Sequence, residues 1–361
     1  MEVPRGKVAD YTLRLRMAGN PGRILLVKPS ALGDVCRSMP ILASLRAAFP
    51  AARIDWLVQD DFEAAVQGHP ALERVVAFPR RAWKRWWMPG VVSQVHRFRG
   101  TLRAANYDLV VDAQGLLRSG LFMRFTGAAR RVGWTDAKEW SWLAANERHA
   151  RRGGPDATEV MLALLEDAGI PPVRDARMHV QASAIQAWRD RRGAMGIGDR
   201  YVALAPTSRW SSKRWPAARW RALAERLVAR GETVLMLGAP SEREQVRACI
   251  PRNGAIDLCG ALPLGEWFAA LAGAEAVVAN DSAAVHAAAA LGRPLVGIYG
   301  ATDPASVGPY RRAESVVAPP GVAPSDPHAY RDARMVQRME LIPVDAVERR
   351  LDVELLRGPR W

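Results

Sequence analysis

The sequence predicts an α/β protein made of two doubly wound domains, each a parallel sheet covered by helices on both faces. Three observations predict it. The chain has 361 residues, which is enough for two or three domains, and 49% of them are apolar. Short, continuously apolar β-rich runs alternate with helix-like segments along the whole chain. Strands that are apolar on both faces are typical of sheets buried between helices.

The first series of elements fills residues 23–134. Its helices are expected at 34–49 and 91–106, where apolar residues follow a helical period. Its β-rich runs lie at 23–28, 53–58, 74–78, 107–113 and 130–134. Each run is bounded by turn-forming residues, so the order is strand, helix, strand.

Glycine and proline become frequent between residues 150 and 200, which predicts a domain boundary near residues 175–198. A second series follows, with β-rich runs at 201–206, 233–240, 255–260, 276–281 and 294–300, and helices at 216–230, 241–250, 264–274 and 282–292. Residues 317–335 are expected to be loop and residues 343–356 a helix. We therefore predict domains at 1–178 and 179–340, with a tail at 341–361 that can pack back on the first domain.

The formal net charge is +14, which calls for an anionic partner. Nucleic acid is disfavoured, because the excess is concentrated: eight Arg or Lys and no acid lie between Glu73 and Asp108. Within that stretch, residues 80–90 interleave Trp83, Trp86 and Trp87 with basic residues, which suits an anionic membrane surface. The alternative is a solvated basic loop with its Trp residues packed inward.

The N-terminus has no hydrophobic signal segment, and no apolar run is long enough to cross a bilayer, so a cytoplasmic protein is expected. The three cysteines, Cys36, Cys249 and Cys259, are too few and too scattered for a disulfide framework or a zinc site. We expect them to be small buried residues.

The first strand ends in the stretch KPSALGD, residues 28–34, which carries Lys28, Ser30, Gly33 and Asp34. A plain strand-to-helix connection needs only the glycine. One interpretation is a turn whose Asp34 caps the next helix. The other is a catalytic or ligand-binding elbow, because ligands of open α/β sheets bind beyond the carboxyl ends of the strands.

The loop at 206–216 follows a strand in the second domain and gathers hydroxyls and cations before a helix begins at Pro216. Donors, positive charge and a helix N-terminus together suit a phosphate, although the Walker pattern is absent. The alternative is a solvated loop. The residues concerned are Thr207, Ser208, Arg209, Ser211, Ser212, Lys213, Arg214 and Trp215.

Three further strand ends carry polar residues. Asp281 and Ser282 stand at the start of a helix, with Ala283 next and His286 one turn on; Asp281 could simply cap, and His286 could be a core residue. Glu242 could accept from ribose hydroxyls or cap its helix, and residues 300–304 could line a site. No G-x-G-x-x-G pattern and no metal-ligand spacing occur, so no nicotinamide, flavin or metal cofactor is expected.

Taken together, LLVKPSALGD, YDLVVDAQGLLRSGL, SSKRWPAARW, LGAPSERE, NDSAAVH and YGATDP resemble the lipopolysaccharide heptosyltransferases of glycosyltransferase family 9 over about residues 22–350. The chain is most similar to the heptosyltransferase I group, which adds the first heptose to the inner-core Kdo sugar. The resemblance implies a GT-B fold, with two Rossmann-like domains facing a central cleft. The N-terminal domain would hold the acceptor, and the C-terminal domain the donor ADP-heptose.

By the same resemblance, Asp34 is the base of an inverting transfer and Lys213 holds the departing diphosphate, which leaves no need for a metal. The residues implied for the donor are Thr207, Ser208, Ser212, Lys213, Trp215, Glu242, Asp281, Ser282, Ala283 and His286. Those implied for the acceptor are Ser30, Gly33, Arg81, Lys84, Arg85, Gln114 and Arg118. The partners implied are ADP-heptose, an inner-core glycolipid and the inner face of the inner membrane, where the protein is peripheral.

Three departures from the family pattern bear on donor and acceptor identity: Ser282-Ala283 replaces Thr-Gly, Ala31 replaces a serine, and Arg37 replaces a histidine. A family relative with another sugar nucleotide or acceptor is therefore the main alternative. A non-catalytic protein that binds anionic glycolipid is another. We expect the loop around Lys213 to be solvated when no donor is bound.

Overall fold

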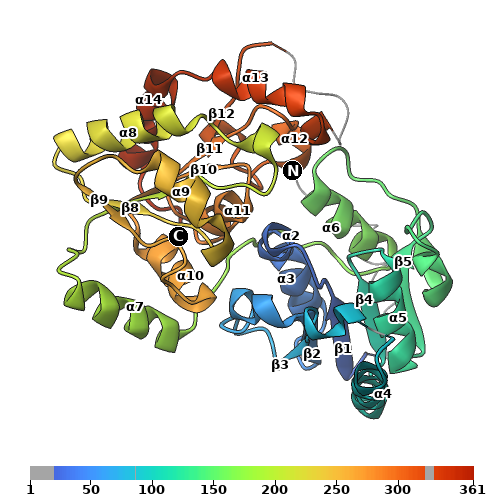
Figure 1. Ribbon diagram of the computed structural model, residues 1–361. Helices are drawn as coiled ribbons and strands as arrows, with labels where there is room; N and C mark the ends of the chain where they lie inside the picture. Colours follow the sequence, from blue (N-terminus) through green and yellow to red (C-terminus); the bar gives the residue numbers. More distant parts are fainter. Residues whose placement is uncertain (1–19, 86, 322–328) are drawn as a thin grey trace. The chain divides into compact units, whose positions relative to one another are not determined.

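The computed structural model describes residues 20–85, 87–321 and 329–361 (Figure 1). Three predictions concern residues outside these ranges: the absence of an N-terminal signal segment, the placement of Trp86, and the middle of the loop predicted at 317–335. The chain divides into two compact units, Met1–Ala176 and Arg177–Trp361. Each unit has one six-stranded parallel sheet with helices, which confirms the predicted class of two Rossmann-like α/β domains.

The sheet of unit 1 has the strand order β3-β2-β1-β4-β5-β6. All neighbours are parallel, and Val27 at the end of β1 is in register with Leu57 of β2 and Asp112 of β4. Its strands are β1 (Arg23–Val27), β2 (Arg53–Gln59), β3 (Arg74–Phe78), β4 (Leu109–Asp112), β5 (Arg130–Trp134) and β6 (Glu147–His149). Every residue of β4 and four of the five in β1 are buried, as a sheet between helical layers requires.

Helices and 3₁₀ turns connect these strands. The α-helices are α2 (Leu32–Cys36), α3 (Met39–Ala48), α4 (Pro89–Ala104), α5 (Leu117–Thr126) and α6 (Ala157–Asp167), and the turns are η1 (Asp60–Ala65), η2 (Ala82–Arg85) and η3 (Ser141–Ala144). The predicted helix over 34–49 is therefore wrong as a single element. Pro40 lacks a backbone N–H and is tolerated only in a first turn, so α3 starts afresh just before it.

Unit 2 repeats the topology, with the order β12-β11-β10-β7-β8-β9. Its strands are β7 (Val202–Ala205), β8 (Val234–Met236), β9 (Ala255–Asp257), β10 (Ala276–Asn280), β11 (Leu295–Ile298) and β12 (Val316–Val317). Counted within the unit, the first strand β7 again lies beside the fourth, β10, as β1 lies beside β4. Both units thus have the strand order 3-2-1-4-5-6 of dinucleotide-binding folds.

The helices of unit 2 include α7 (Ala182–Ala194), α8 (Ala217–Ala229), α9 (Arg243–Cys249), α10 (Leu264–Gly273), α11 (Ala283–Ala290) and α12 (Pro304–Val307). The chain ends with α13 (Val336–Glu340) and α14 (Val344–Arg357). The 3₁₀ turns are η4 (Ser211–Lys213), η5 (Pro240–Glu242), η6 (Ala313–Ser315), η7 (Ala329–Arg331) and η8 (Ala333–Met335).

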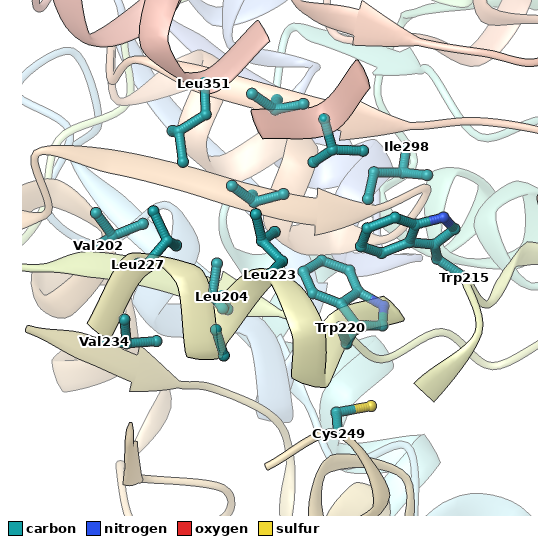
Figure 2. Packing of buried hydrophobic residues seen from close by; sticks show 14 of the residues in the cluster. Val202, Leu204, Trp215, Trp220, Leu223, Leu227, Val234, Cys249, Ile298 and Leu351 are labelled. Carbon is teal, nitrogen blue, oxygen red and sulfur yellow. The ribbon is translucent and has the colours of Figure 1, made fainter. Parts of the chain in front are cut away.

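The core of unit 2 forms between α8, the sheet and the final helix (Figure 2). Trp220, Leu223 and Leu227 of α8 pack there with Leu351 of α14. Because Val347 and Leu351 are fully buried in this cluster, α14 belongs to unit 2. The apolar face of the helix is buried in unit 2, and the predicted packing of the 341–361 tail on the first domain stays a prediction.

Candidate active-site residues on the two units

In each unit the candidate residues follow the two strands between which the strand order reverses. Asp34 follows β1 and Gln114 follows β4; Lys213 follows β7 and Asp281 follows β10. The connections after such a pair of strands run in opposite directions and leave a crevice at the carboxyl edge of the sheet. The two halves of the predicted site thus occupy equivalent places in two separate folds.

Asp34 lies in the first turn of α2, three residues after the N-cap Ala31. The interpretation of Asp34 as the N-cap is therefore wrong. Its carboxylate is 3.4 Å from Nε of Arg37 and 42% exposed, while the Arg37 side chain is buried. The carboxylate is thus open to solvent on one side and lies beside the Arg37 guanidinium on the other.

Lys28 and Asp112 lie at the carboxyl ends of the paired strands β1 and β4, close to Asp34 in the chain or in the sheet. Both are buried. Burial lowers the pKa of the Lys28 ammonium, against the effect of the nearby Asp34 and Asp112 charges, which raise it. Burial also raises the pKa of Asp112, although hydrogen bonds from Gly115, Gln114 and Ser119 act in the opposite direction.

The loops after β1 and β4 are joined by hydrogen bonds. The backbone N–H of Ser30 donates to Oε1 of Gln114 at 3.3 Å, and Asp112 accepts from the backbone N–H groups of Gln114 and Gly115 at 2.9 and 3.1 Å. Sequence analysis predicted Ser30 and Gln114 as acceptor residues, and the structure brings them together. Gly33 directly precedes Asp34, in the first turn of α2.

The basic residues predicted for the acceptor differ in their surroundings. The guanidinium of Arg118 lies 5.8 Å from the Phe78 ring centroid, and burial together with the Arg80 charge lowers its pKa. Arg81 is largely exposed and pairs with Asp61 at 3.1 Å. Lys84 and Arg85 are exposed on η2.

Two tryptophans of the segment 80–90 differ in burial, which bears on whether this segment is a membrane surface or a solvated loop with its Trp residues packed inward. Trp83 packs inward: its Nε1 donates to Oε1 of Gln94 at 3.1 Å, and its ring lies 5.2 Å from that of Phe98. Trp87 is instead 64% exposed. The inward-packed alternative therefore holds for Trp83 and not for Trp87.

On unit 2, Lys213 and Asp281 meet directly. Nζ of Lys213 is 2.6 Å from Oδ2 of Asp281, and the side chains are 14% and 6% exposed. Thr302 adds a hydrogen bond from Oγ1 to the same carboxylate oxygen at 2.6 Å. The ammonium also lies 4.7 Å from the ring centroid of Tyr330. The prediction of a solvated loop around Lys213 is wrong, because the cation is held by a buried carboxylate.

The same geometry decides between two roles for Asp281. The N-cap of α11 is Ser282, and the Asp281 carboxylate points to Lys213 and Thr302. The capping alternative is therefore wrong for Asp281. Ala283 opens the helix and is half-buried like Ser282, whereas His286 is buried one turn further on.

Trp215 and Ser212 anchor the loop instead of facing solvent. Trp215 is 2% exposed, packs against Trp220 in the core (Figure 2), and donates from Nε1 to the Ile342 carbonyl at 2.8 Å. Ser212 is buried and donates to the Tyr330 carbonyl. In this structure they fix the backbone on both sides of Lys213, and their contact with a donor stays a prediction.

Other hydrogen bonds complete the support of this loop. The Trp215 backbone N–H donates to Oδ1 of Asn280 at 3.1 Å, and the Ser208 hydroxyl donates to the Asp281 carbonyl at 3.3 Å. Thr207 and Ser208 are buried in this arrangement. Glu242 accepts from the Ala239 backbone N–H at 2.8 Å, which is the capping interaction left open above.

Three residues escaped sequence analysis as individual site residues. Thr302 lies in the stretch 300–304, which was only a candidate lining, while Asn280 is the last residue of a buried strand. Tyr330 lies in an aperiodic loop, where nothing in the sequence indicates that its ring approaches Lys213. A spacing of more than a hundred residues separates it from that lysine.

The described residues contain neither a metal-binding cluster nor a membrane-spanning helix. No group of three or more His, Cys, Asp or Glu among them is arranged to hold a metal ion. No helix within the same ranges is long and apolar enough to span a membrane.

The family model of glycosyltransferase family 9 (heptosyltransferase) matches residues 95–325. This chain belongs to glycosyltransferase family 9. It is 33% identical to lipopolysaccharide heptosyltransferase 1 of Pseudomonas aeruginosa over 303 residues, which cover 81% of this chain and 82% of that protein. It is 31% identical to the Escherichia coli K12 protein of the same name, with 82% and 94% covered.

The solved structures agree with this assignment. E. coli heptosyltransferase WaaC with ADP matches with a TM-score of 0.74 at 28% identity, covering 92% of this chain and 99% of that one. E. coli ADP-heptose lps heptosyltransferase II matches in fold, with a TM-score of 0.75 at 21% identity, covering 93% of this chain and 99% of that one. The family 9 protein is thus a glycosyltransferase, and the predicted GT-B class is confirmed.

Proposed function

We propose that this family 9 enzyme transfers heptose from ADP-heptose to an inner-core, Kdo-type sugar of lipopolysaccharide, with inversion at the anomeric carbon. The observation that carries the proposal is the equivalent placement of Asp34 and Lys213. Each follows the first strand of its unit, at the reversal of strand order. The relatives named lipopolysaccharide heptosyltransferase 1, and a solved WaaC with ADP-2-deoxy-2-fluoro heptose, support the choice of donor.

The acceptor step needs a base. As the acceptor hydroxyl oxygen attacks the anomeric carbon from the face opposite the diphosphate, its proton passes to the Asp34 carboxylate. The carboxylate beside Arg37 is 42% exposed, which leaves it accessible to an acceptor hydroxyl. Ser30, Gly33, Gln114 and Arg118 on the same unit would orient the acceptor sugar.

The donor step needs positive charge. The bond between the anomeric carbon and the diphosphate oxygen breaks with its electron pair on oxygen, so negative charge grows on ADP. Lys213 supplies the cation, with the start of α11 at Ser282 and Ala283 nearby in the same crevice. In the proposed mechanism Lys213 exchanges part of its pairing with Asp281 for the diphosphate. No metal ion or cofactor is included in it.

The proposed place of action is the cytoplasmic face of the inner membrane, where the protein binds peripherally. The exposed cations Arg81, Lys84 and Arg85 support an anionic surface as a partner.

A direct assay tests the function. The purified chain is incubated with ADP-heptose and a water-soluble, deacylated Kdo disaccharide, and ADP release and the product mass are followed. Asp34→Asn should lower turnover by about 10²- to 10⁴-fold, with donor affinity and melting temperature near wild type. The matched control is Asp167→Asn, which removes a carboxylate paired with Arg152 at the end of α6.

The outcomes separate the alternatives. Full turnover in a folded Asp34→Asn protein would remove this residue as the base. Transfer from a different sugar nucleotide but not from ADP-heptose would identify a relative with another donor. Glycolipid binding without turnover with any donor would identify a non-catalytic binding protein.

A further inference from the structure

Unit 1 carries an exposed apolar surface that no step above uses. Among the described residues, twelve large apolar side chains are exposed, and seven of them lie between residues 87 and 143. They are Trp87, Met88, Val92, Leu117, Leu121, Trp140 and Leu143. All seven lie on or beside η2, α4, α5 and η3, so they are gathered on connected elements instead of scattered singly over the surface.

These elements pack on one another. α4 contacts both η2 and α5, and α5 contacts η3. Figure 1 labels α4 and α5. The α5–η3 contact is close: a Cβ added at Gly120 would lie 2.6 Å from the Ser141 hydroxyl, so only glycine fits there. The backbone N–H of Leu117 also donates to Glu139 at 3.0 Å. We call the resulting surface, residues 81–85, 87–104, 117–126 and 138–144, the apolar–basic face.

Trp140 is the most exposed of the seven. It is 75% exposed, and Leu143 beside it is 64% exposed. Glu139 and Trp140 have consecutive positive φ angles of 54° and 59°, a conformation that residues other than glycine rarely adopt. Leu117 and Leu121 lie one turn apart on the same side of α5. Four exposed apolar side chains therefore lie on the two elements that meet at this contact: Leu117 and Leu121 on α5, Trp140 at the N-cap of η3, and Leu143 within η3.

The charge around this surface indicates its partner. Residues 80–143 contain twelve Arg or Lys and only four Asp or Glu, a net charge of +8 out of +14 for the whole chain. The exposed cations on the same elements include Lys84, Arg85, Arg97, Arg99, Arg103, Arg124 and Lys138. Two such faces repel each other, which disfavours a second copy of this chain as the occupant. Exposed Trp and Leu among cations instead suit the headgroup region of an anionic bilayer.

We propose that the apolar–basic face docks on an anionic phospholipid bilayer, with Trp140, Leu143, Leu117 and Leu121 inserted at the headgroup level and the cations held over the anionic lipids. α4, α5 and η3 follow β3, β4 and β5, so the face borders the carboxyl edge of the sheet that also carries Asp34. If the proposed function holds, this docking brings the base to the height at which the sugars of a membrane-anchored glycolipid emerge.

The test is flotation of the full chain with vesicles of phosphatidylcholine, with and without phosphatidylglycerol, in the absence of any sugar nucleotide. Trp140→Ser with Leu143→Ser should weaken partitioning into the anionic vesicles at least about tenfold, since two apolar side chains lose their burial. Leu356→Ser, at a side chain that is 90% exposed in unit 2, is the matched control and should leave partitioning unchanged. Arg81→Ser, Lys84→Ser and Arg85→Ser combined should weaken binding at low salt most strongly.

The measurement is independent of catalysis. Transfer to the soluble Kdo disaccharide and the melting temperature are recorded for the Trp140/Leu143 variant, and both should match wild type. Failure of heptose transfer in all proteins, with vesicle binding as expected, would count against the proposed function alone. Three results would overturn the docking proposal. The Trp140/Leu143 variant could partition into anionic vesicles as wild type does, or wild type could bind equally well to vesicles without phosphatidylglycerol. The third result is that the variant loses self-association and keeps its vesicle binding.

Discussion

Replacing Lys213 by methionine should destabilise unit 2, because the Asp281 carboxylate would remain buried without its cation. Breaking a buried ion pair on one side costs about 3–5 kcal/mol. The lower end, about 3 kcal/mol, is expected here, since Thr302 still donates to Asp281 and the Lys213 side chain is 14% exposed, so that water can enter. At about 2–4 °C per kcal/mol for a unit of this size, the melting temperature should fall by about 6–12 °C.

The assay is differential scanning calorimetry of the ligand-free chain. The double variant Lys213→Met with Asp281→Asn removes both charges and should regain most of the lost stability, with a coupling of about 2 kcal/mol. Arg334→Met is the control, because it breaks the exposed pair with Asp332 on neighbouring η8 and should leave the melting temperature nearly unchanged. A Lys213→Met protein that melts within 1 °C of wild type (about 0.25–0.5 kcal/mol), or a double variant no more stable than the single one, would refute the buried pair.

Three further outcomes are expected. Tyr330→Leu should raise the donor KM about three- to tenfold and Tyr330→Phe should not, because only the ring face is needed beside the Lys213 ammonium; equal effects in both variants would contradict this role. ADP should raise the melting temperature more than UDP or GDP does, and a larger shift with UDP would point to another donor. Cys36 and Cys249 should resist thiol reagents at pH 8 until the chain unfolds, since burial raises both pKa values to about 12, and rapid labelling of the native protein would contradict that burial.

Much of the fold could be predicted because buried parallel strands leave a strong apolar pattern. The first five strands of each sheet, in chain order, were predicted, whereas β6 and β12 were missed. These two edge strands have three and two residues, too few to show a period. The break between α2 and α3 depends on Pro40, whose effect is local and could have been recognised from the sequence.

The candidate site was predictable residue by residue but not in its pairings. Lys213 and Asp281 each follow a strand, a position that the sequence indicates, yet nothing local shows that they meet at 2.6 Å. The surroundings of Trp215 were equally hidden. The sequence placed it two positions after a predicted phosphate-binding lysine, and the structure buries its side chain in the core of unit 2, with Nε1 donating to the Ile342 carbonyl. Tertiary packing, which a single sequence does not display, decided both cases.

The assignment of α14 to unit 2 has a consequence for exchange between relatives. With the last helix in the second unit, each unit is one continuous stretch of chain, and a single junction near Ala176–Arg177 separates them. The residues predicted to bind the acceptor all lie before that junction, and those predicted to bind the donor all lie after it. One recombination event could therefore give this chain the donor half of another family member, without a second crossover to return the C-terminal helix to its partner.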